Sequence, residues 1–210
     1  MCRIAGRRTV GSVSNGSQFE VRFHGRGGQG VVTAAELLSV AAFTEGRHAQ
    51  AFPSFGSERT GAPVVAFCRI AGRAIRTREP IAHPDALVIQ DPTLLHQVDV
   101  FGGVAGDGYV LINTSRSLVD LGIGEFAERF HDERIRTVPA GEIAREHTGR
   151  PLPNAALLGA FAALTGVVSI DAVETAVRAR FSGKVGEGNA AAARATFDLV
   201  RTELPEAVDA

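Results

Sequence analysis

The stretch HGRGGQG, from His24 to Gly30, holds the residues of this sequence most suited to binding a charged group. Glycines at the first, third and sixth positions after the histidine allow a tight turn in which backbone N–H groups approach a phosphate closely. An arginine inside the turn adds a positive charge. The candidate binding residues here are Gly25, Arg26, Gly27, Gly28, Gln29 and Gly30. A turn that only lets a strand and a helix pack closely has the same glycine spacing, so both interpretations stay open at this point.

Two common kinds of phosphate site do not fit these residues. A nicotinamide-binding turn needs an acidic residue roughly 20 positions further on, where it holds the ribose hydroxyls. The next extended segment of this chain ends instead in Phe52-Pro53, and Glu45 comes before it. A lysine P-loop is excluded because Val31-Val32 follows the turn and Lys184 is the only lysine. The geometry of the turn would still suit a pyrophosphate group.

A second group of polar residues lies in the segment PSFGSERTGAP, Pro53 to Pro63. Loops of this length in compact domains often carry function, and this one connects two strands of the same predicted sheet. Its candidate binding residues are Ser57, Glu58, Arg59 and Thr60. Asn113 is a further candidate because it ends the strand YVLIN. The alternatives are a solvated surface loop for the first feature and a capping role for the second.

The hydrophobic pattern predicts the strands and helices that must position these residues. The predicted strands are Phe19–His24, a short extended piece at His48–Phe52, Val64–Ile70, Ala86–Gln90, Tyr109–Asn113 and Ile135–Val138. The predicted helices are Gln29–Glu45, Glu142–His147, Asn154–Thr165, Ile170–Phe181 and Gly188–Glu203. Continuous apolar strands that close on polar residues are typical of parallel sheets with a ligand site at their carboxyl ends. We therefore expect an α/β fold, with a Rossmann-like, mostly parallel sheet, a glycine-rich first turn and a helical C-terminal section.

The C-terminal section also carries helix-boundary signals. Asn154 and Ser169 are residue types that favour the N-cap position. Three glycines, Gly149, Gly166 and Gly183, stand where helices are expected to stop. The segment NAAAARATF, residues 189–197, is rich in small side chains and suits close helix packing, either against a partner chain or against its own domain.

Composition limits the classes of protein that this chain can be. With 210 residues and 45% hydrophobic content, it can bury one sizeable core. We expect a flexible N-terminal lead-in over 1–18 and one domain over 19–210, divided into an α/β core (19–140) and a helical section (141–210). A formal net charge of -1 gives no bulk field for nucleic acid or an anionic membrane, and no apolar run is long enough to span a membrane.

The numbers and spacing of the cysteines and histidines limit the metal sites and disulfides that this chain can form. The two cysteines, Cys2 and Cys68, cannot supply a disulfide framework or the four thiolates of an iron–sulfur cluster. The six histidines show neither ligand spacing nor a triad pattern. We therefore expect no metal site in this chain and a reducing, cytoplasmic location.

Longer motifs now make a family recognisable. The chain contains HGRGGQGVVTAAELL, QAFPSFGSERTGAPVVAFCRI, NAALLGAFAALTG and KVGEGNAAAARATF. Together, from about Val21 to Phe197, they closely resemble the gamma subunit of the pyruvate:ferredoxin type of 2-oxoacid:acceptor oxidoreductases. The resemblance implies alpha and beta chains as partners, with a delta chain as a further candidate, and ferredoxin or a similar protein as electron acceptor. It also implies that thiamine diphosphate, Mg²⁺ and iron–sulfur clusters are held in those partner chains.

The resemblance also implies a ligand for the glycine turn. In single-chain relatives the equivalent domain helps to bind coenzyme A, so the turn would serve the diphosphate of coenzyme A. The matching positions are the turn Gly25–Gly30, the loop Ser57–Gly61 and the strand end Asn113. In fused relatives the loop is rich in lysine, whereas here it reads Glu58-Arg59.

Function follows from this as an expectation. The chain would be a subunit of an enzyme that oxidatively decarboxylates a 2-oxoacid to an acyl-coenzyme A, and it would not be catalytic alone. The PSFGSERTGAP form of the loop resembles the pyruvate-like branch of the family, which implies pyruvate as the 2-oxoacid. The alternatives are a subunit of an aryl-2-oxoacid enzyme, of the indolepyruvate or phenylglyoxylate type, and a nucleotide-binding or assembly module without catalysis.

Overall fold

The computed structural model describes residues 18–54 and 60–204. Its strands are β1 (Gln18–Arg26), β2 (His48–Pro53), β3 (Pro63–Ala71), β4 (Ala86–Ile89), β5 (Tyr109–Asn113) and β6 (Ile135–Val138). They form one sheet in the order β2-β3-β1-β4-β5-β6. β1, β4, β5 and β6 pair in parallel, and β3 runs antiparallel to both of its neighbours. The expected mostly parallel α/β sheet is confirmed, with β3 as the strand of opposite direction.

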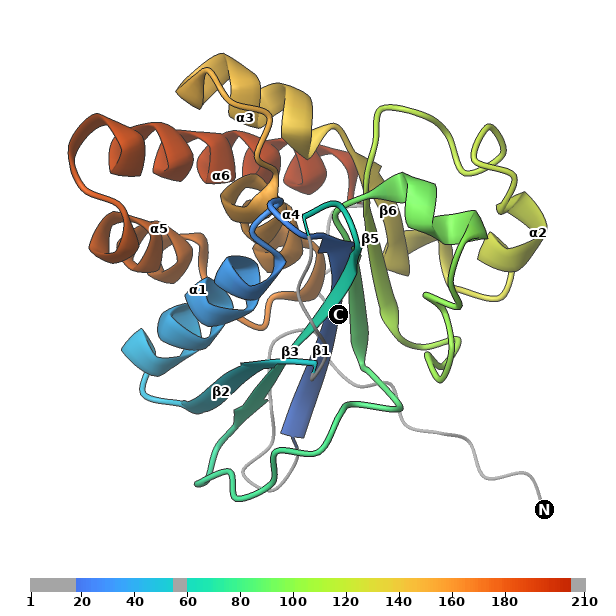
Figure 1. Ribbon diagram of the computed structural model, residues 1–210, viewed down its shortest axis with the longest axis horizontal. Helices are drawn as coiled ribbons and strands as arrows, with labels where there is room; N and C mark the ends of the chain where they lie inside the picture. Colours follow the sequence, from blue (N-terminus) through green and yellow to red (C-terminus); the bar gives the residue numbers. More distant parts are fainter. Residues whose placement is uncertain (1–17, 55–59, 205–210) are drawn as a thin grey trace, which may run out of the picture.

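Helices cover the two faces of this sheet unequally. The α-helices are α1 (Val31–Thr44), α2 (Gly124–Ala127), α3 (Ala140–Thr148), α4 (Asn154–Thr165), α5 (Ile170–Arg180) and α6 (Gly183–Glu203). Two 3₁₀ helices, η1 (Pro92–His96) and η2 (Asp132–Arg134), lie in the connections. Figure 1 shows α1 and α3 to α6 on one side of the sheet and α2 on the other.

The side chains divide into two cores that match these layers. Along β4, Val88 belongs to the core beneath α1 and α4, whereas Leu87 and Ile89 belong to the core on the α2 side. This alternation is what a strand covered on both faces requires, because successive side chains point to opposite faces. The same alternation predicts on which face of the sheet a polar side chain at the end of such a strand lies.

The C-terminal helices pack around α4, which is buried along its whole length. Gly159 lets α6 come close, because a Cβ at this position would lie 1.8 Å from the carbonyl oxygen of Ala193. Thr196 on α6 is fully buried and donates a hydrogen bond to the Ala156 carbonyl at 2.5 Å. Ala190, Ala192 and Ala193 of the segment 189–197 are buried, and α6 packs against α4 of the same chain, which is the second of the two alternatives that the sequence left open.

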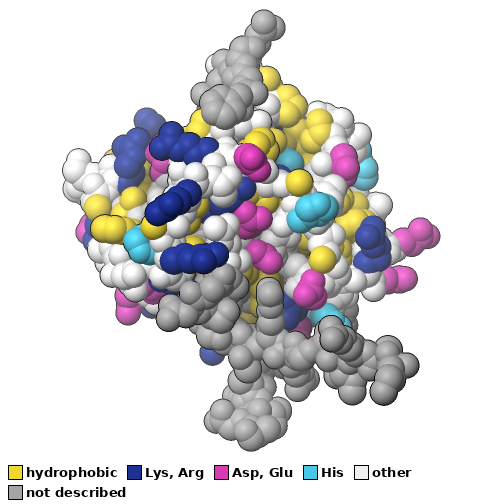
Figure 2. Space-filling view, turned by 90° about the horizontal axis from the view of Figure 1, so that it is seen from below, with side chains coloured by type: hydrophobic (Ala, Val, Ile, Leu, Met, Phe, Trp, Pro, Cys, Tyr) yellow, Lys and Arg dark blue, Asp and Glu magenta, His cyan; other side chains and the backbone are white. Residues whose placement is uncertain are grey.

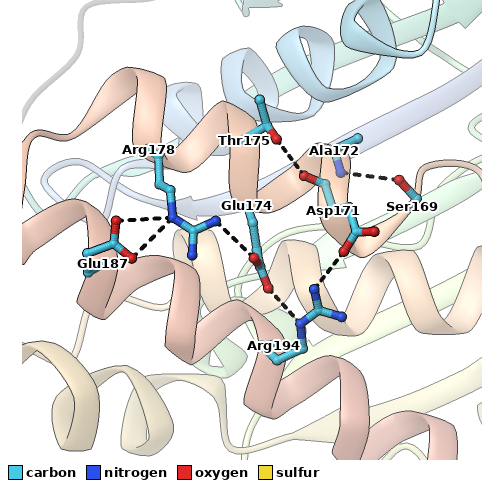
Figure 3. A network of polar contacts seen from close by, with 8 residues as sticks. All are labelled: Ser169, Asp171, Ala172, Glu174, Thr175, Arg178, Glu187 and Arg194. Carbon is cyan, nitrogen blue, oxygen red and sulfur yellow. Dashed lines mark hydrogen bonds and ion pairs between the residues drawn. The ribbon is translucent and has the colours of Figure 1, made fainter.

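A polar network links α5 to α6 on the outside of this layer (Figure 3). Glu174 is its centre and accepts from Arg194 Nε at 2.6 Å and from Arg178 Nη1 at 2.9 Å. Arg194 also donates to Asp171 at 2.7 Å, and Arg178 Nε lies 3.1 Å from Glu187. Hydrogen bonds from the two arginines outweigh the effect of burial on the Glu174 carboxyl group, so its pKa is lowered.

Most expected helix ends are confirmed. Ser169 caps α5 by accepting from the Ala172 N–H at 3.1 Å. Gly149 and Gly166 end α3 and α4 in the left-handed conformation, with φ of 74° and 62°. Helix α1 begins at Val31, two residues after the predicted start, because the residue before it is left-handed.

Two boundary predictions are wrong. Asn154 is the first residue of α4 and not its N-cap, since its Oδ1 accepts from the adjacent Ala155 N–H at 2.8 Å and Pro153 takes the cap position. Gly183 does not stop a helix but begins α6, five residues before the predicted start. The reason is that Phe181 and Ser182 are extended and end α5 without a glycine.

The amino-terminal edge of the parallel strands lies at the opposite end of the molecule from the glycine turn. Figure 2 views the molecule from this end and shows Lys and Arg side chains gathered on one side. The exposed residues Arg73, Arg76 and Arg78 follow β3 at this edge, because β3 runs against the other strands. These arginines are too far from the glycine turn to take part in its site.

No helix within 18–54 and 60–204 has the length and apolarity needed to cross a membrane.

Candidate functional site

The glycine turn joins β1 to α1 at the carboxyl edge of the sheet (Figure 1). Gly28 and Gly30 have φ values of 92° and 73°, in the region that favours glycine. Gly25 is needed for space, because a Cβ there would lie 2.6 Å from Val31 Cγ2 and 3.2 Å from Gln90 Cβ. The turn therefore brings the start of α1 close to the ends of β1 and β4.

Some backbone N–H groups of the turn donate to an acceptor in the protein, and others have no acceptor within the described residues. The Gly27 N–H donates to the Ala62 carbonyl and the Gln29 N–H to the Arg26 carbonyl, both at 3.0 Å. Within the described residues, no acceptor bonds to the N–H groups of Gly28, Gly30 or the first three residues of α1.

Nothing in the described structure neutralises this helix start. Helix α1 has no side-chain cap and no acidic residue in its first turn. An uncapped helix start with N–H groups and a positive dipole end favours an anion. Apart from Gly27 and Gln29, no described atom lies within 4 Å of the position of a Cβ on Gly28.

Asp91 fixes the turn from the side. It follows β4, and its Oδ2 accepts from Arg26 Nε at 3.1 Å and from Gln29 Nε2 at 2.8 Å. Its Oδ1 accepts from the Thr93 N–H at 3.0 Å and from Thr93 Oγ1 at 2.6 Å. Burial alone would raise the pKa of Asp91, but the bonds from Thr93 and Gln29 and the charge of Arg26 outweigh it and lower the pKa. Asp91 is therefore ionised at neutral pH and holds the turn in place.

The Arg26 guanidinium is already occupied by protein groups. Besides Asp91, it donates to the Gly61 carbonyl at 3.0 Å, to Thr93 Oγ1 at 2.7 Å and to Gln97 Oε1 at 2.8 Å. Four of its five N–H donors are thus used within the protein. Its contacts favour a role in organising the turn over the phosphate contact expected from the sequence.

The second polar loop reaches the glycine turn at its described end. Thr60 forms a bridge with Gly27, and the Gly61 N–H donates to the Gly27 carbonyl at 3.1 Å. Ser57, Glu58 and Arg59 lie outside the described residues, so their expected roles stay predictions. The structure thus brings together the glycine turn and the residues that directly follow Arg59 in the sequence.

Asn113 lies at the same edge, but its amide joins two elements. Its Nδ2 donates to the Gln90 carbonyl and its Oδ1 accepts from the Gly141 N–H, each at 2.9 Å. The side chain thus ties the end of β5 to the end of β4 and the start of α3. This bonding resembles the capping role that the sequence offered as the alternative.

Two side chains missed by sequence reasoning also lie here. Gln90 is 1% exposed, and neither its Nε2 nor its Oε1 has a hydrogen-bond partner within the described residues. Asn154, at the start of α4, is buried, and its Nδ2 lies 2.6 Å from the position of a Cβ on Gly30. A usable signal for Gln90 was its place, as a polar residue closing a buried strand at the ligand edge.

Other titratable groups near the motif are parts of the packing. His24 faces away from the turn, toward the other side of the sheet, and accepts from Arg22 Nε at 3.0 Å. Burial, with the charge of Arg22, lowers the pKa of His24 to about 3, so the ring is neutral at neutral pH.

Burial raises the pKa of the Cys68 thiol well above its usual value. In the described parts of the chain, no group of three or more His, Cys, Asp or Glu residues could hold a metal ion. The unpaired backbone groups of the turn are N–H donors, which suits holding an anionic ligand.

Comparison with known proteins gives a consistent result. The family model described as Pyruvate ferredoxin/flavodoxin oxidoreductase matches residues 20–199. A protein of Pyrococcus abyssi named pyruvate/ketoisovalerate oxidoreductases common subunit gamma is 50% identical over 179 residues, which are 85% of this chain and 95% of that protein. The crystal structure of pyruvate oxidoreductase subunit PORC from Thermotoga maritima is 34% identical with a TM-score of 0.73, over 86% of this chain and 96% of the other.

A larger enzyme shares the fold at low sequence identity. The structure of 2-oxoglutarate:ferredoxin oxidoreductase from Magnetococcus marinus, with 2-oxoglutarate, coenzyme A and succinyl-CoA bound, has a TM-score of 0.66 and 15% identity. The match covers 90% of this chain and 32% of that chain. At this identity the likeness concerns the fold alone.

Proposed function

The chain belongs to the pyruvate ferredoxin/flavodoxin oxidoreductase family, as a gamma-type subunit, and from this premise we propose that it forms part of the coenzyme A site of a multichain 2-oxoacid oxidoreductase. The enzyme would decarboxylate a 2-oxoacid oxidatively, with pyruvate as the proposed substrate, and pass the acyl group to coenzyme A. Alpha and beta chains are the proposed partners, and ferredoxin the proposed acceptor. Thiamine diphosphate with Mg²⁺ and iron–sulfur clusters, held by the partner chains, would supply decarboxylation and electron transfer.

The observation that carries the proposal is the uncapped start of α1. The N–H groups of Gly28, Gly30 and Val31 to Thr33 have no acceptor within the described residues, and they meet at the carboxyl edge of a parallel sheet. Open α/β sheets bind ligands at this edge, and a helix start of this kind holds a phosphate. In this proposal the turn therefore holds the diphosphate of coenzyme A.

Two features support coenzyme A over a nicotinamide dinucleotide. The strand that follows α1 ends in Phe52 and Pro53 and not in an acid, and the antiparallel β3 separates this strand from β1. Furthermore, an oxidoreductase that shares the fold was solved with coenzyme A bound. This chain would bind and orient coenzyme A while the chemistry takes place on groups of the partner chains.

A pair of substitutions at Gly28 tests the proposal. Gly28→Asp and Gly28→Asn have nearly the same size and suffer the same strain at a φ of 92°, and apart from the adjacent residues no described atom lies within 4 Å of the new Cβ. They differ in charge, so a diphosphate at the turn is repelled by the aspartate only. In the assembled enzyme, we expect a KM for coenzyme A about tenfold higher in the Asp variant than in the Asn variant, with an unchanged KM for the 2-oxoacid. Equal KM values for coenzyme A in the two variants would rule out an anion at this turn.

A further inference from the structure

Gln90 is a buried amide whose polar atoms are unused. Its backbone is fixed on both sides, because its N–H donates to the His24 carbonyl at 2.7 Å and its carbonyl accepts from Asn113 at 2.9 Å. The side-chain Nε2 and Oε1 have no partner within the described residues, although the residue is 1% exposed. Leaving a buried amide unpaired destabilises a fold, so such a group indicates a role other than packing.

The Gln90 side chain faces the layer of α1 and α4. Side chains alternate along a strand, and Val88, two residues earlier, belongs to the core beneath these helices. The Cβ of Gln90 lies 3.2 Å from the position of a Cβ on Gly25, and Cγ2 of Val31 lies 2.6 Å from the same position. Gln90 is therefore a neighbour of the first residue of α1.

The start of α4 lies beside the start of α1. Asn154 Nδ2 is 2.6 Å from the position of a Cβ on Gly30, and it has no acceptor among the described residues, whereas Oδ1 accepts from the Ala155 N–H. Like α1, helix α4 has no side-chain cap and no acidic residue in its first turn. Two helix starts and two side-chain amides thus border the same glycine turn, Gln90 beside Gly25 and Asn154 beside Gly30, and Gln90 Oε1 is an unused acceptor there.

We infer that Gln90 recognises the pantoyl amide of coenzyme A, the neutral arm next to the diphosphate. The inference rests on the proposed function, which places the diphosphate at the start of α1. A glutamine amide carries both donors and an acceptor, and so pairs with a ligand group that offers both, such as an amide. Asn154 Nδ2 then adds a donor for the carbonyl or hydroxyl oxygen of the same arm.

The position of Gln90 favours this arm over adenine. In coenzyme A the pantoyl unit follows the diphosphate directly, whereas a ribose separates adenine from it. Gln90 adjoins Val31, the first residue of α1, so the group that it reaches is one directly attached to the diphosphate. Gln90 would therefore distinguish coenzyme A from nucleotides that lack this arm.

Equilibrium binding to the assembled enzyme tests the inference with two probes. Adenosine 3′,5′-bisphosphate contains adenine and phosphates but no pantoyl arm, whereas coenzyme A contains all three. For Gln90→Met, which keeps the length of the side chain and removes its polar atoms, we expect the Kd for coenzyme A to rise about tenfold and the Kd for the bisphosphate to stay the same. The Tm should stay equal or rise, because an unpaired buried amide is removed. Gln50→Met makes the same change on the edge strand β2, away from the glycine turn, and should change neither Kd.

The outcomes separate this inference from the proposed function. An unchanged Kd for coenzyme A, a loss confined to the bisphosphate, or an equal loss of both ligands in Gln90→Met overturns the role of Gln90. Gly28→Asp places a charge beside the phosphates and should weaken both probes. If Gly28→Asp weakens both while Gln90→Met weakens neither, only the role of Gln90 is wrong, whereas no effect of Gly28→Asp contradicts the proposed function itself. If Gln90→Met does not fold, Gln90→Leu is measured in the same way.

Discussion

Arg26 holds three segments together at the candidate site. Its guanidinium contacts Asp91 and Thr93 after β4, Gly61 at the end of the second polar loop, and Gln97 after η1. The carboxylate of Asp91 is ionised at neutral pH and partly buried, so its charge depends on these donors. Removing one partner of such a pair leaves the other without compensation. Arg26 therefore acts on ligand binding through the shape of the turn.

Alanine substitutions of two arginines separate positioning from direct contact. Arg26→Ala should destabilise the fold by about 2 kcal/mol, a fall in Tm of about 4–8 °C for a domain of this size. Arg59→Ala, which removes the cation expected to contact a phosphate, should raise the KM for coenzyme A roughly tenfold to hundredfold and leave the Tm unchanged. Differential scanning fluorimetry and steady-state kinetics of the assembled enzyme measure both effects. An unchanged Tm in Arg26→Ala would show that the contacts of Arg26 do not organise the turn.

Sequence reasoning at this scale found residue types better than it found their partners. The glycines of the turn were predictable because positive φ and close approach require glycine whatever the rest of the fold does. Arg26 and Asp91 are 65 positions apart in the sequence, so their pairing depends on β1 and β4 being neighbours. The same holds for Gln90 and Asn154, which are candidate site residues because of their neighbours in the folded chain. The only signal in the sequence was the position of Gln90 at the end of a buried strand.

At the scale of elements, the C-terminal helices form one body around α4. Gly159 and the small residues of α6 set the close approach of α4 and α6, and the Glu174 network ties α5 to α6 on the outside (Figure 3). The contact between α4 and α6 depends on the fit of small side chains, whereas the contact between α5 and α6 depends on charged groups. The stability of the α5–α6 contact should therefore change with pH, and that of the α4–α6 contact should not.

Glu174→Gln tests the charge contact through its pH dependence. Burial opposes ionisation of Glu174, but hydrogen bonds from Arg194 and Arg178 outweigh it, so the pKa is lowered in the folded state. The carboxylate thus stabilises the fold above the usual pKa of about 4.3, and this stabilisation is lost as pH falls through the lower folded value. We expect the variant to be less stable by about 0.5 kcal/mol at pH 7, the size typical of a solvent-screened ion pair. Its urea midpoint should meet that of the parent chain below about pH 4.

The control for this measurement is Glu36→Gln. Glu36 is an exposed residue of α1 that takes part in no ion pair among the described residues. Its urea midpoint should match that of the parent chain across the pH range. If the difference in urea midpoint between Glu174→Gln and the parent chain is the same at pH 3 as at pH 7, the network does not act through the charge of Glu174.

Sequence periodicity predicted the long elements well and the short ones poorly. The strands from β1 to β6 were found because apolar alternation and continuous apolar runs reflect which faces are buried. The short elements η1, α2 and η2 were missed, since one turn is too short to show a period. The start of α6 was missed because Gly183 fits a helix stop as well as a helix start, and the extended backbone of Phe181 and Ser182 decides between them.

For the whole molecule, the sheet places all the candidate site groups at one edge. The glycine turn, Gln90, Asn113 and the start of α4 come from four segments, and they meet because the carboxyl ends of β1, β4 and β5 share this edge. The α5–α6 network lies on the outer helices, away from the sheet edge (Figure 1). A ligand at the proposed site should therefore leave a local footprint.

Hydrogen–deuterium exchange of the assembled enzyme, with and without coenzyme A, tests this placement most directly. The N–H groups of Gly28, Gly30 and the first turn of α1 have no acceptor within the described residues, so they should exchange readily in the free enzyme. Coenzyme A at the turn would bond to them and slow the exchange of peptides that cover residues 25–35, while peptides of α5 and α6 stay unchanged. If saturating coenzyme A leaves residues 25–35 unprotected while protecting another part of the complex, this chain does not hold the diphosphate of coenzyme A.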